Sequence, residues 1–419
     1  MADRKVLFLD TTLRDGEQSA GIGMTGDEKF EIAKQLQKMK VDIIEAGFAA
    51  SSPGDFEAVS RIAKEIEGPI ICSLARAHPN DVDQAWQSIQ YAEKHRIHVF
   101  LSTSNIHVMH QLRKNREEVM GMAVSMVARA KEYCSDVEFS PMDATRTVPE
   151  YLYRMLEEVI KAGATTVNIA DTVGYAIPSD FTRLIKDIQA NVPGIENVNL
   201  SVHCHNDLGL SVSNSLAAIE AGAQQVEGCI NGIGERAGNA SLAEVAVVLK
   251  DKLGLQLSID ETRIGLLSNM VENFSGKWIA ANTPIVGADV FTQTAGIHAD
   301  GDLKGDLYMS ELGPERFARK RVYALGKMSG KASLINNLEE LGISLSQKDQ
   351  AKVLERIVKL GDSKQNITSD DLPFIIADVM ESKEYQHITL LNCYISSGLD
   401  VESTASIRVS INGEEQQGS

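Results

Sequence analysis

The stretch TTVNIADTVGYAIPSDFTRLIKDIQANV, residues 165–192, contains one complete unit of the fold that the sequence predicts. Its first part, TTVNIAD, is short, apolar and rich in β-branched residues, as expected for a buried strand. A loop containing Gly174 follows, and from Phe181 onward apolar residues recur every three to four positions, which predicts an amphipathic helix. Ser179 stands where we expect the N-cap of this helix.

The same unit recurs along residues 1–256, and helical patterns lie between the apolar runs. The other seven runs are KVLFLD (5–10), VDIIEAGF (41–48), PIICSL (69–74), IHVFLSTS (97–104), VEFSPM (137–142), VNLSVHCH (198–205) and VEGCINGIG (226–234). Alternating strands and helices imply parallel strands joined by crossover helices, and eight units in roughly 250 residues match an α/β fold, the (β/α)8 TIM barrel. An open, doubly wound sheet also fits, because the number of units does not prove closure.

Beyond the predicted barrel the pattern changes. Residues 257–383 read as mainly helical, and we expect them to form helical linker subdomains. Residues 384–419 turn β-like, with two predicted strands, and two strands do not make an independent domain. We therefore expect 384–419 to be the beginning of a C-terminal α+β regulatory domain that is apparently truncated.

The composition narrows the class of protein. The chain is 43% hydrophobic and has a formal net charge of −17, which argues against a nucleic-acid-binding face. The N-terminus lacks an apolar signal region and no run of ~18 apolar residues occurs, so we predict neither secretion nor a membrane span. Five scattered cysteines without a CxxC pair fit the reduced thiols of a cytoplasmic protein.

In a barrel of this kind the active site lies at the C-terminal ends of the strands, and chemically useful side chains gather there. They are Arg14, Asp15 and Glu17 after the first strand, Glu45 in the second, Asp171 and Thr172 at the end of the sixth, His203 and His205 in the seventh, and Glu235, Arg236 and Asn239 after the eighth.

The two histidines of SVHCHNDLGL (201–210) lie two residues apart, so in a strand both point to the same face. Taken alone, this spacing fits packed core histidines as well as metal ligands. Because carboxylate and amide oxygens are predicted at the same rim, we favour a divalent ion such as Mn²⁺, Zn²⁺ or Mg²⁺. No thiolate joins the set, which favours a catalytic over a structural ion.

Five motifs together resemble the DRE-TIM metallolyase superfamily, and within it most closely the 2-isopropylmalate synthases. They are DTTLRDGEQS (10–19), EAGFAASSPGDFEAV (45–59), SVHCHNDLGL, VEGCINGIGERAGNASLAEV (226–245) and TAGIHADG (294–301). The resemblance extends from about residue 5 to about residue 383. It implies a metal-dependent Claisen-type condensation of acetyl-CoA with 2-oxoisovalerate, followed by thioester hydrolysis.

The resemblance also implies roles for individual residues. The metal ligands fall on Asp15, His203, His205 and Asn239, the catalytic residues on Arg14, His298 and Tyr308, and the expected substrate contacts on Thr172, Glu45, Arg76 and Asp300. In the family the helper histidine and tyrosine reach into the partner's barrel, so we expect a homodimer whose linker region completes the partner's site.

Two departures from the family pattern leave the acceptor open. Met142 precedes Asp143 where relatives usually carry Glu, and Ala170 precedes Asp171 where they usually carry Pro. The same chemistry on 2-oxoglutarate or pyruvate, as in homocitrate and citramalate synthases, is therefore an alternative. An acyl-CoA lyase fits less well because GIGERAGN lacks the lyase cysteine, and a non-catalytic binding paralogue is opposed by the near-complete set of metal and base residues.

Overall fold

The computed structural model describes residues 5–294, 301, 307, 310–363, 367–380, 388–399, 401–411 and 413–418. The chain divides into two compact units. The first contains the chain up to Val290 together with Glu315–Arg319, and the second contains Phe291–Pro314 and everything from Lys320 onward. His298, Asp300 and Tyr308, all predicted site residues, lie outside the described residues.

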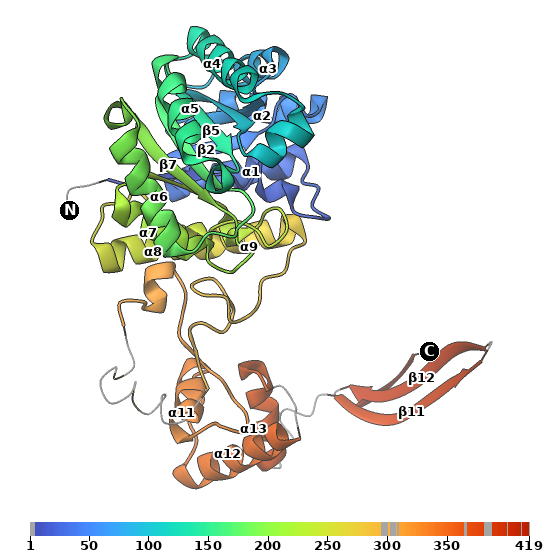
Figure 1. The fold of residues 1–419 in the computed structure, drawn as a ribbon. Coiled ribbons are helices and arrows are strands. Elements are labelled where there is room, and N and C mark those ends of the chain that lie inside the picture. Colours follow the sequence, from blue (N-terminus) through green and yellow to red (C-terminus); the bar gives the residue numbers. More distant parts are fainter. Residues whose placement is uncertain are drawn as a thin grey trace. The chain divides into compact units, whose positions relative to one another are not determined.

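The first unit is built on eight parallel strands that form a closed barrel in sequence order, with helices around it (Figure 1). Closure is visible at β1, where Leu9 is paired with Ile43 of β2 and Leu7 is paired with Gln225 of β8. The predicted (β/α)8 barrel is confirmed, and the open-sheet alternative is excluded. The strands are β1 Leu7–Asp10, β2 Ile43–Gly47, β3 Ile70–Arg76, β4 His95–Ser102, β5 Val137–Met142, β6 Thr166–Asp171, β7 Asn199–Cys204 and β8 Gln225–Gly228.

Helices cover the outside of this barrel, so most strand residues are buried on both faces. The helices are α1 Gly26–Met39, α2 Pro53–Glu65, α3 Pro79–Ile89, α4 Arg116–Tyr133, α5 Pro149–Lys161, α6 Pro178–Asn191, α7 Ser211–Ala221 and α8 Leu242–Leu253. The unit continues through α9 (Ile264–Ser275), which packs against α1.

Local sequence explains where the helices start. Thr25 and Glu28 form a reciprocal capping box at the start of α1, as this residue pair favours. The prediction that Ser179 caps α6 is wrong, because the helix begins at Pro178 and its N-cap is Ile177, two residues before Ser179. Proline suits the first helical position because it lacks the N–H that would have no partner there.

The second unit holds a small helical core and two sheets. Helices α11 (Lys331–Glu340), α12 (Gln347–Asp362) and α13 (Leu372–Met380) bury Leu334, Leu338, Val353, Ile357 and Leu372. β9 (Thr292–Gln293) pairs with β10 (Val322–Tyr323), and β11 (Ile388–Gly398), β12 (Val401–Ile411) and β13 (Glu414–Gly418) form an antiparallel sheet. The regulatory and linker roles expected for this region remain predictions.

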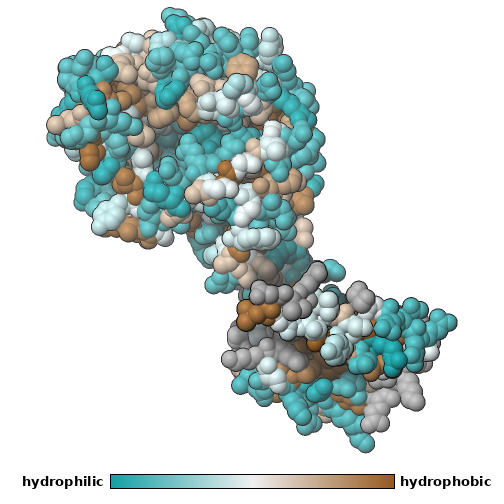
Figure 2. Space-filling view, turned by 90° about the vertical axis from the view of Figure 1, so that its right-hand side faces the viewer, coloured by the Kyte–Doolittle hydropathy of each residue, from teal (hydrophilic) through white to brown (hydrophobic). Residues whose placement is uncertain are grey.

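Neither the described helices nor the visible surface of the barrel unit has an unusually apolar character. No helix within the described residues is long and apolar enough to cross a membrane. On the face shown in Figure 2 the barrel unit presents mostly hydrophilic residues with hydrophobic ones scattered among them, which is ordinary for a protein surface.

Candidate active site at the barrel mouth

A cavity of about 150 Å³ lies among the C-terminal ends of the barrel strands. Its lining comes from strands β3–β8 and from the loops after β1, β6, β7 and β8, so all of it belongs to the first unit. The lining residues are Arg14, Asp15, Gln18, Leu74, His98, Phe100, Ser140, Met142, Asn168, Ala170, Thr172, His203, His205, Glu227, Glu235 and Arg236.

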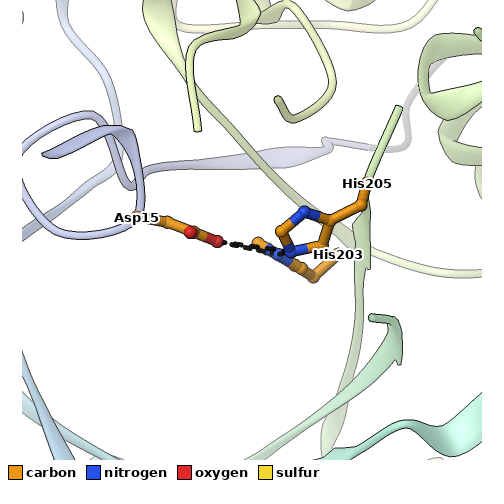
Figure 3. Close-up of side chains that lie close together, drawn as sticks. All are labelled: Asp15, His203 and His205. Carbon is orange, nitrogen blue, oxygen red and sulfur yellow. Dashed lines mark hydrogen bonds and ion pairs between the residues drawn. The ribbon is translucent and has the colours of Figure 1, made fainter. Parts of the chain in front are cut away.

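Three predicted metal ligands meet in this cavity (Figure 3). Oδ2 of Asp15 lies 3.1 Å from Nε2 of His203 and 3.6 Å from Nε2 of His205. The two Nε2 atoms are 3.1 Å apart, so both imidazoles point to the same face of the strand, as their spacing predicts. All three side chains are buried. One carboxylate oxygen and two imidazole nitrogens therefore converge on a single point.

Asn239, the fourth predicted ligand, is joined to His205 through its backbone but does not line the cavity. Its backbone forms a β-bridge with His205, and its Nδ2 donates to the carbonyl of Ile233 at 3.1 Å. Its Oδ1 is buried without a hydrogen-bond partner among the described residues, as expected for an oxygen that binds an ion. Gly238, at φ +89°, makes this loop possible, because a Cβ there would lie 2.0 Å from the carbonyl oxygen of Gly232.

The charges of the cluster suit a cation. Burial alone would raise the pKa of Asp15, but Arg14 and His203 outweigh burial and hold that pKa below its usual range. Burial disfavours the His203 imidazolium, yet the carboxylates of Asp15 and Glu227 raise its pKa to about 9. Burial and the charge on His203 lower the pKa of His205 to about 4. Near neutral pH the pair therefore carries one positive charge, on His203, and a divalent cation would displace this extra proton.

Arg14 is fixed at the edge of the same cluster. Its Nε donates to Oε2 of Glu45 at 2.6 Å, and its Nη1 lies 3.3 Å from Oδ2 of Asp15. Glu45 also accepts from the Thr11 hydroxyl at 2.6 Å and contacts Nδ1 of His98 at 2.7 Å. The predicted substrate contact Glu45 is fully buried and is not among the cavity-lining residues. Its visible role is to orient Arg14.

The cavity has two contrasting sides. We call Arg14, Asp15, His203 and His205 the polar wall, which comes from the β1 loop, β7 and the residue after β7. We call Leu74, Phe100, Met142 and Ala170 the apolar wall, which comes from β3–β6. Since β1 and β7 flank β8 in the closed barrel, the two walls occupy different arcs of its rim.

Polar side chains also line the cavity on the strands that carry the apolar wall. Nε2 of His98 lies 2.6 Å from Oγ of Ser140, which accepts from Nδ2 of Asn168 at 2.8 Å. The hydroxyl oxygen of Thr172 accepts from the backbone N–H of Asp143 at 2.8 Å. This bond fixes the Thr172 hydroxyl and leaves its proton available for a ligand.

Arg76, another predicted substrate contact, lies at the end of β3 but does not line the cavity. Its guanidinium pairs with Asp81 at 2.5 Å, and 60% of its side chain is exposed. From there it fits a contact with an exposed part of a large substrate better than a contact inside the cavity.

Sequence reasoning missed several lining residues, namely Leu74, His98, Phe100, Ser140, Asn168 and Glu227. A signal for some of them exists, because polar residues at every second position of a predicted strand share one face. Glu138 and Ser140 alternate in this way. Leu74 and Phe100 carry no such signal, since they look like ordinary core residues.

Two protein-family models match this chain. Residues 5–271 match the family described as HMGL-like, and residues 285–365 match the one described as homocitrate synthase post-HMGL domain-like. Solved lyase structures share the fold at low identity. Hydroxymethylglutaryl-CoA lyase from Pseudomonas aeruginosa has a TM-score of 0.58 at 19% identity, covering 66% of this chain and 95% of that one.

Curated relatives are much more similar. A 2-isopropylmalate synthase of Pelotomaculum thermopropionicum is 46% identical over 98% of this chain and 82% of its own length. The 2-isopropylmalate synthase of Aquifex aeolicus is 45% identical over 99% of this chain and 81% of its own length. The 2-isopropylmalate synthase of Pyrococcus abyssi is 44% identical over 99% of this chain and 85% of its own length.

Proposed function

The chain belongs to the family of 2-isopropylmalate synthases, which are acyltransferases, and we propose that it condenses acetyl-CoA with 2-oxoisovalerate and that water then hydrolyses the thioester, giving 2-isopropylmalate and CoA. The observation that carries this proposal is the convergence of Asp15, His203 and His205 on one point of a cavity that also has an apolar wall. The high identity to synthases, against under 25% to lyases, favours condensation over cleavage.

The site suits a divalent ion, Mn²⁺, Zn²⁺ or Mg²⁺, which Asp15, His203, His205 and the free Oδ1 of Asn239 would hold. When bound, such an ion polarises the carbonyl of the 2-oxo acid. Imidazole, carboxylate and amide oxygen are donors that such ions accept.

The surrounding residues of the chain supply the rest of the chemistry. Arg14, held by Glu45, presents its guanidinium beside the same point and stabilises negative charge that develops on the acceptor's carbonyl oxygen. The Thr172 hydroxyl donates to the acceptor's carboxylate. From the family resemblance, His298 takes the methyl proton of acetyl-CoA with the help of Tyr308.

The apolar wall supports a branched aliphatic acceptor. Leu74, Phe100, Met142 and Ala170 offer no charge to a second carboxylate such as that of 2-oxoglutarate. His98 does not offer one either, because Glu45 and Ser140 occupy both of its ring nitrogens. Pyruvate would leave part of the apolar wall without contacts, which costs binding energy.

The choice of acceptor is tested by kcat/KM for 2-oxoisovalerate, pyruvate and 2-oxoglutarate, measured as release of free CoA. We expect 2-oxoisovalerate to be preferred by about tenfold or more, as pocket fit of this kind provides. A preference for another of these acids would change the proposed acceptor but leave the proposed reaction type standing. Absence of CoA release with all three would overturn the proposal.

We also propose the homodimer that the resemblance implies, with His298 and Tyr308 completing the partner's site. Variants Asp15→Asn and His298→Ala should each be inactive alone and should regain activity when mixed under exchanging conditions, because hybrid dimers contain one intact site. Failure of mixed subunits to recover any activity, despite proven exchange, would contradict this arrangement.

A further inference from the structure

The two imidazoles of the polar wall differ in what their second nitrogen meets. Nδ1 of His203 lies 3.1 Å from Oε2 of Glu227, on β8. Nδ1 of His205 is buried and has no hydrogen-bond partner among the described residues. The Nδ1–Oε2 distance is within hydrogen-bond range, although the contact is not yet aligned as a full hydrogen bond.

Glu227 also differs from the other buried glutamates of the barrel. Glu45 receives donors from Arg14 and Thr11, and Glu138 receives them from Arg96 and Gln225. Glu227 is 1% exposed, and within the described part of the chain neither of its oxygens accepts an aligned hydrogen bond.

A carboxylate buried without such donors is costly, so the fold gains from a cationic or N–H partner for it. His203 is the partner within reach, at 3.1 Å, and it is also a predicted metal ligand. Glu138 and His98 lie in the same buried group. His98 is bonded to Glu45 and Ser140, so it does not replace His203 in this role. Burial raises the pKa of Glu138 to about 8, so its carboxyl can share one proton with Glu227, but it cannot orient His203.

Resting on the metal site proposed above, we propose that Glu227 is a positioning residue: it accepts a hydrogen bond from Nδ1–H of His203 and so keeps the Nε2 lone pair directed into the cavity. Carboxylate support of this kind fixes the tautomer and ring orientation of a ligating imidazole and raises its basicity. His205 lacks such support, so the two imidazoles contribute unequally to holding an ion.

The test is a titration of the metal-free full chain with Co²⁺, followed by visible absorbance, for wild type, Glu227→Gln and Glu138→Gln. We expect Glu227→Gln to bind Co²⁺ about tenfold more weakly, because removal of such a support costs ~10–100-fold in affinity. Glu138→Gln is the matched control, because it changes a neighbouring, fully buried glutamate to an amide that can still donate to Glu227. We expect its affinity to stay within about twofold of wild type.

The outcomes separate this inference from the proposed function. If the wild-type protein did not bind Co²⁺, the proposed metal site itself would be contradicted. Equal Co²⁺ affinity in wild type and Glu227→Gln, or equal weakening in both variants, would overturn the role of Glu227 alone. A second measurement needs no variant. In the Zn²⁺-loaded wild-type protein, a nitrogen-15 NMR spectrum should show a proton on Nδ1 of His203. The absence of this proton would also overturn the role of Glu227.

Discussion

The polar and apolar walls of the cavity are built on different principles. Every polar-wall side chain is fixed by a charged or imidazole neighbour within 3.6 Å, so its position depends on specific pairs. The apolar wall is defined by shape alone, since Leu74, Phe100 and Ala170 offer only van der Waals surface to a ligand. We infer that the polar wall carries the reaction and that the apolar wall selects the acceptor.

The largest expected effect comes from removing a polar-wall ligand. His203→Ala should lower kcat by about 10³-fold or more, because a polarising ion contributes several kcal/mol to the barrier. Release of free CoA with 2-oxoisovalerate measures this. His110→Ala, which changes an exposed histidine away from the cavity, should leave the rate unchanged. A His203 variant with near-normal kcat would contradict the inference that the polar wall carries the reaction.

The next largest effect is expected at Thr172. Thr172→Val should raise KM for the oxo acid about tenfold with a smaller change in kcat, because one ground-state hydrogen bond of ~1–1.5 kcal/mol is lost. Thr172→Ser retains the hydroxyl that accepts from Asp143 and serves as the control. An unchanged KM in Thr172→Val would show that this hydroxyl does not contact the acceptor.

A smaller effect should follow from enlarging the apolar wall. Met142→Ala should shift the kcat/KM ratio by ~1 kcal/mol, or roughly fivefold, toward a 2-oxo acid with one more methylene. Turnover at saturation should change little, since the polar wall is intact. A large loss of kcat with every acceptor would place Met142 in the chemistry and contradict the assignment of this wall to selection.

The smallest effect is expected outside both walls, at Arg76. Arg76→Ala should raise KM for acetyl-CoA roughly twofold, as loss of an exposed charged contact of ~0.5 kcal/mol does, with kcat unchanged. Initial rates at saturating oxo acid measure this KM. Arg61→Ala, which removes another exposed arginine that pairs with Asp27, is the control. A change in KM for the oxo acid instead would place Arg76 closer to the cavity.

Much of the fold could be predicted because each strand–helix unit carries its own local pattern. Residues 165–192 predict β6 and α6, and only the cap at Ser179 was wrong, since Pro178 fits the first helical position better. Barrel closure depends on the pairing of β1 with β8, more than 200 residues apart, which no local pattern encodes.

The candidate site was predictable to a similar degree. The polar wall could be read from charged residues at strand ends, because such residues are unusual next to buried runs. The apolar wall could not be read in full, because Leu74 and Phe100 resemble core residues and only strand register turns them toward the cavity. Glu227 could not be predicted as a site residue for a related reason, because its proposed role depends on a contact with His203 on the neighbouring strand.

We infer that this cavity brings an ion and a 2-oxo acid together in one reaction. The most direct measurement is release of free CoA from acetyl-CoA by chelator-treated full-length protein, with and without Mn²⁺ and with and without 2-oxoisovalerate. We predict rapid release only when both Mn²⁺ and 2-oxoisovalerate are present, with 2-isopropylmalate as the product. Equally rapid release of CoA in excess chelator without added Mn²⁺, or without 2-oxoisovalerate, would contradict this mechanism.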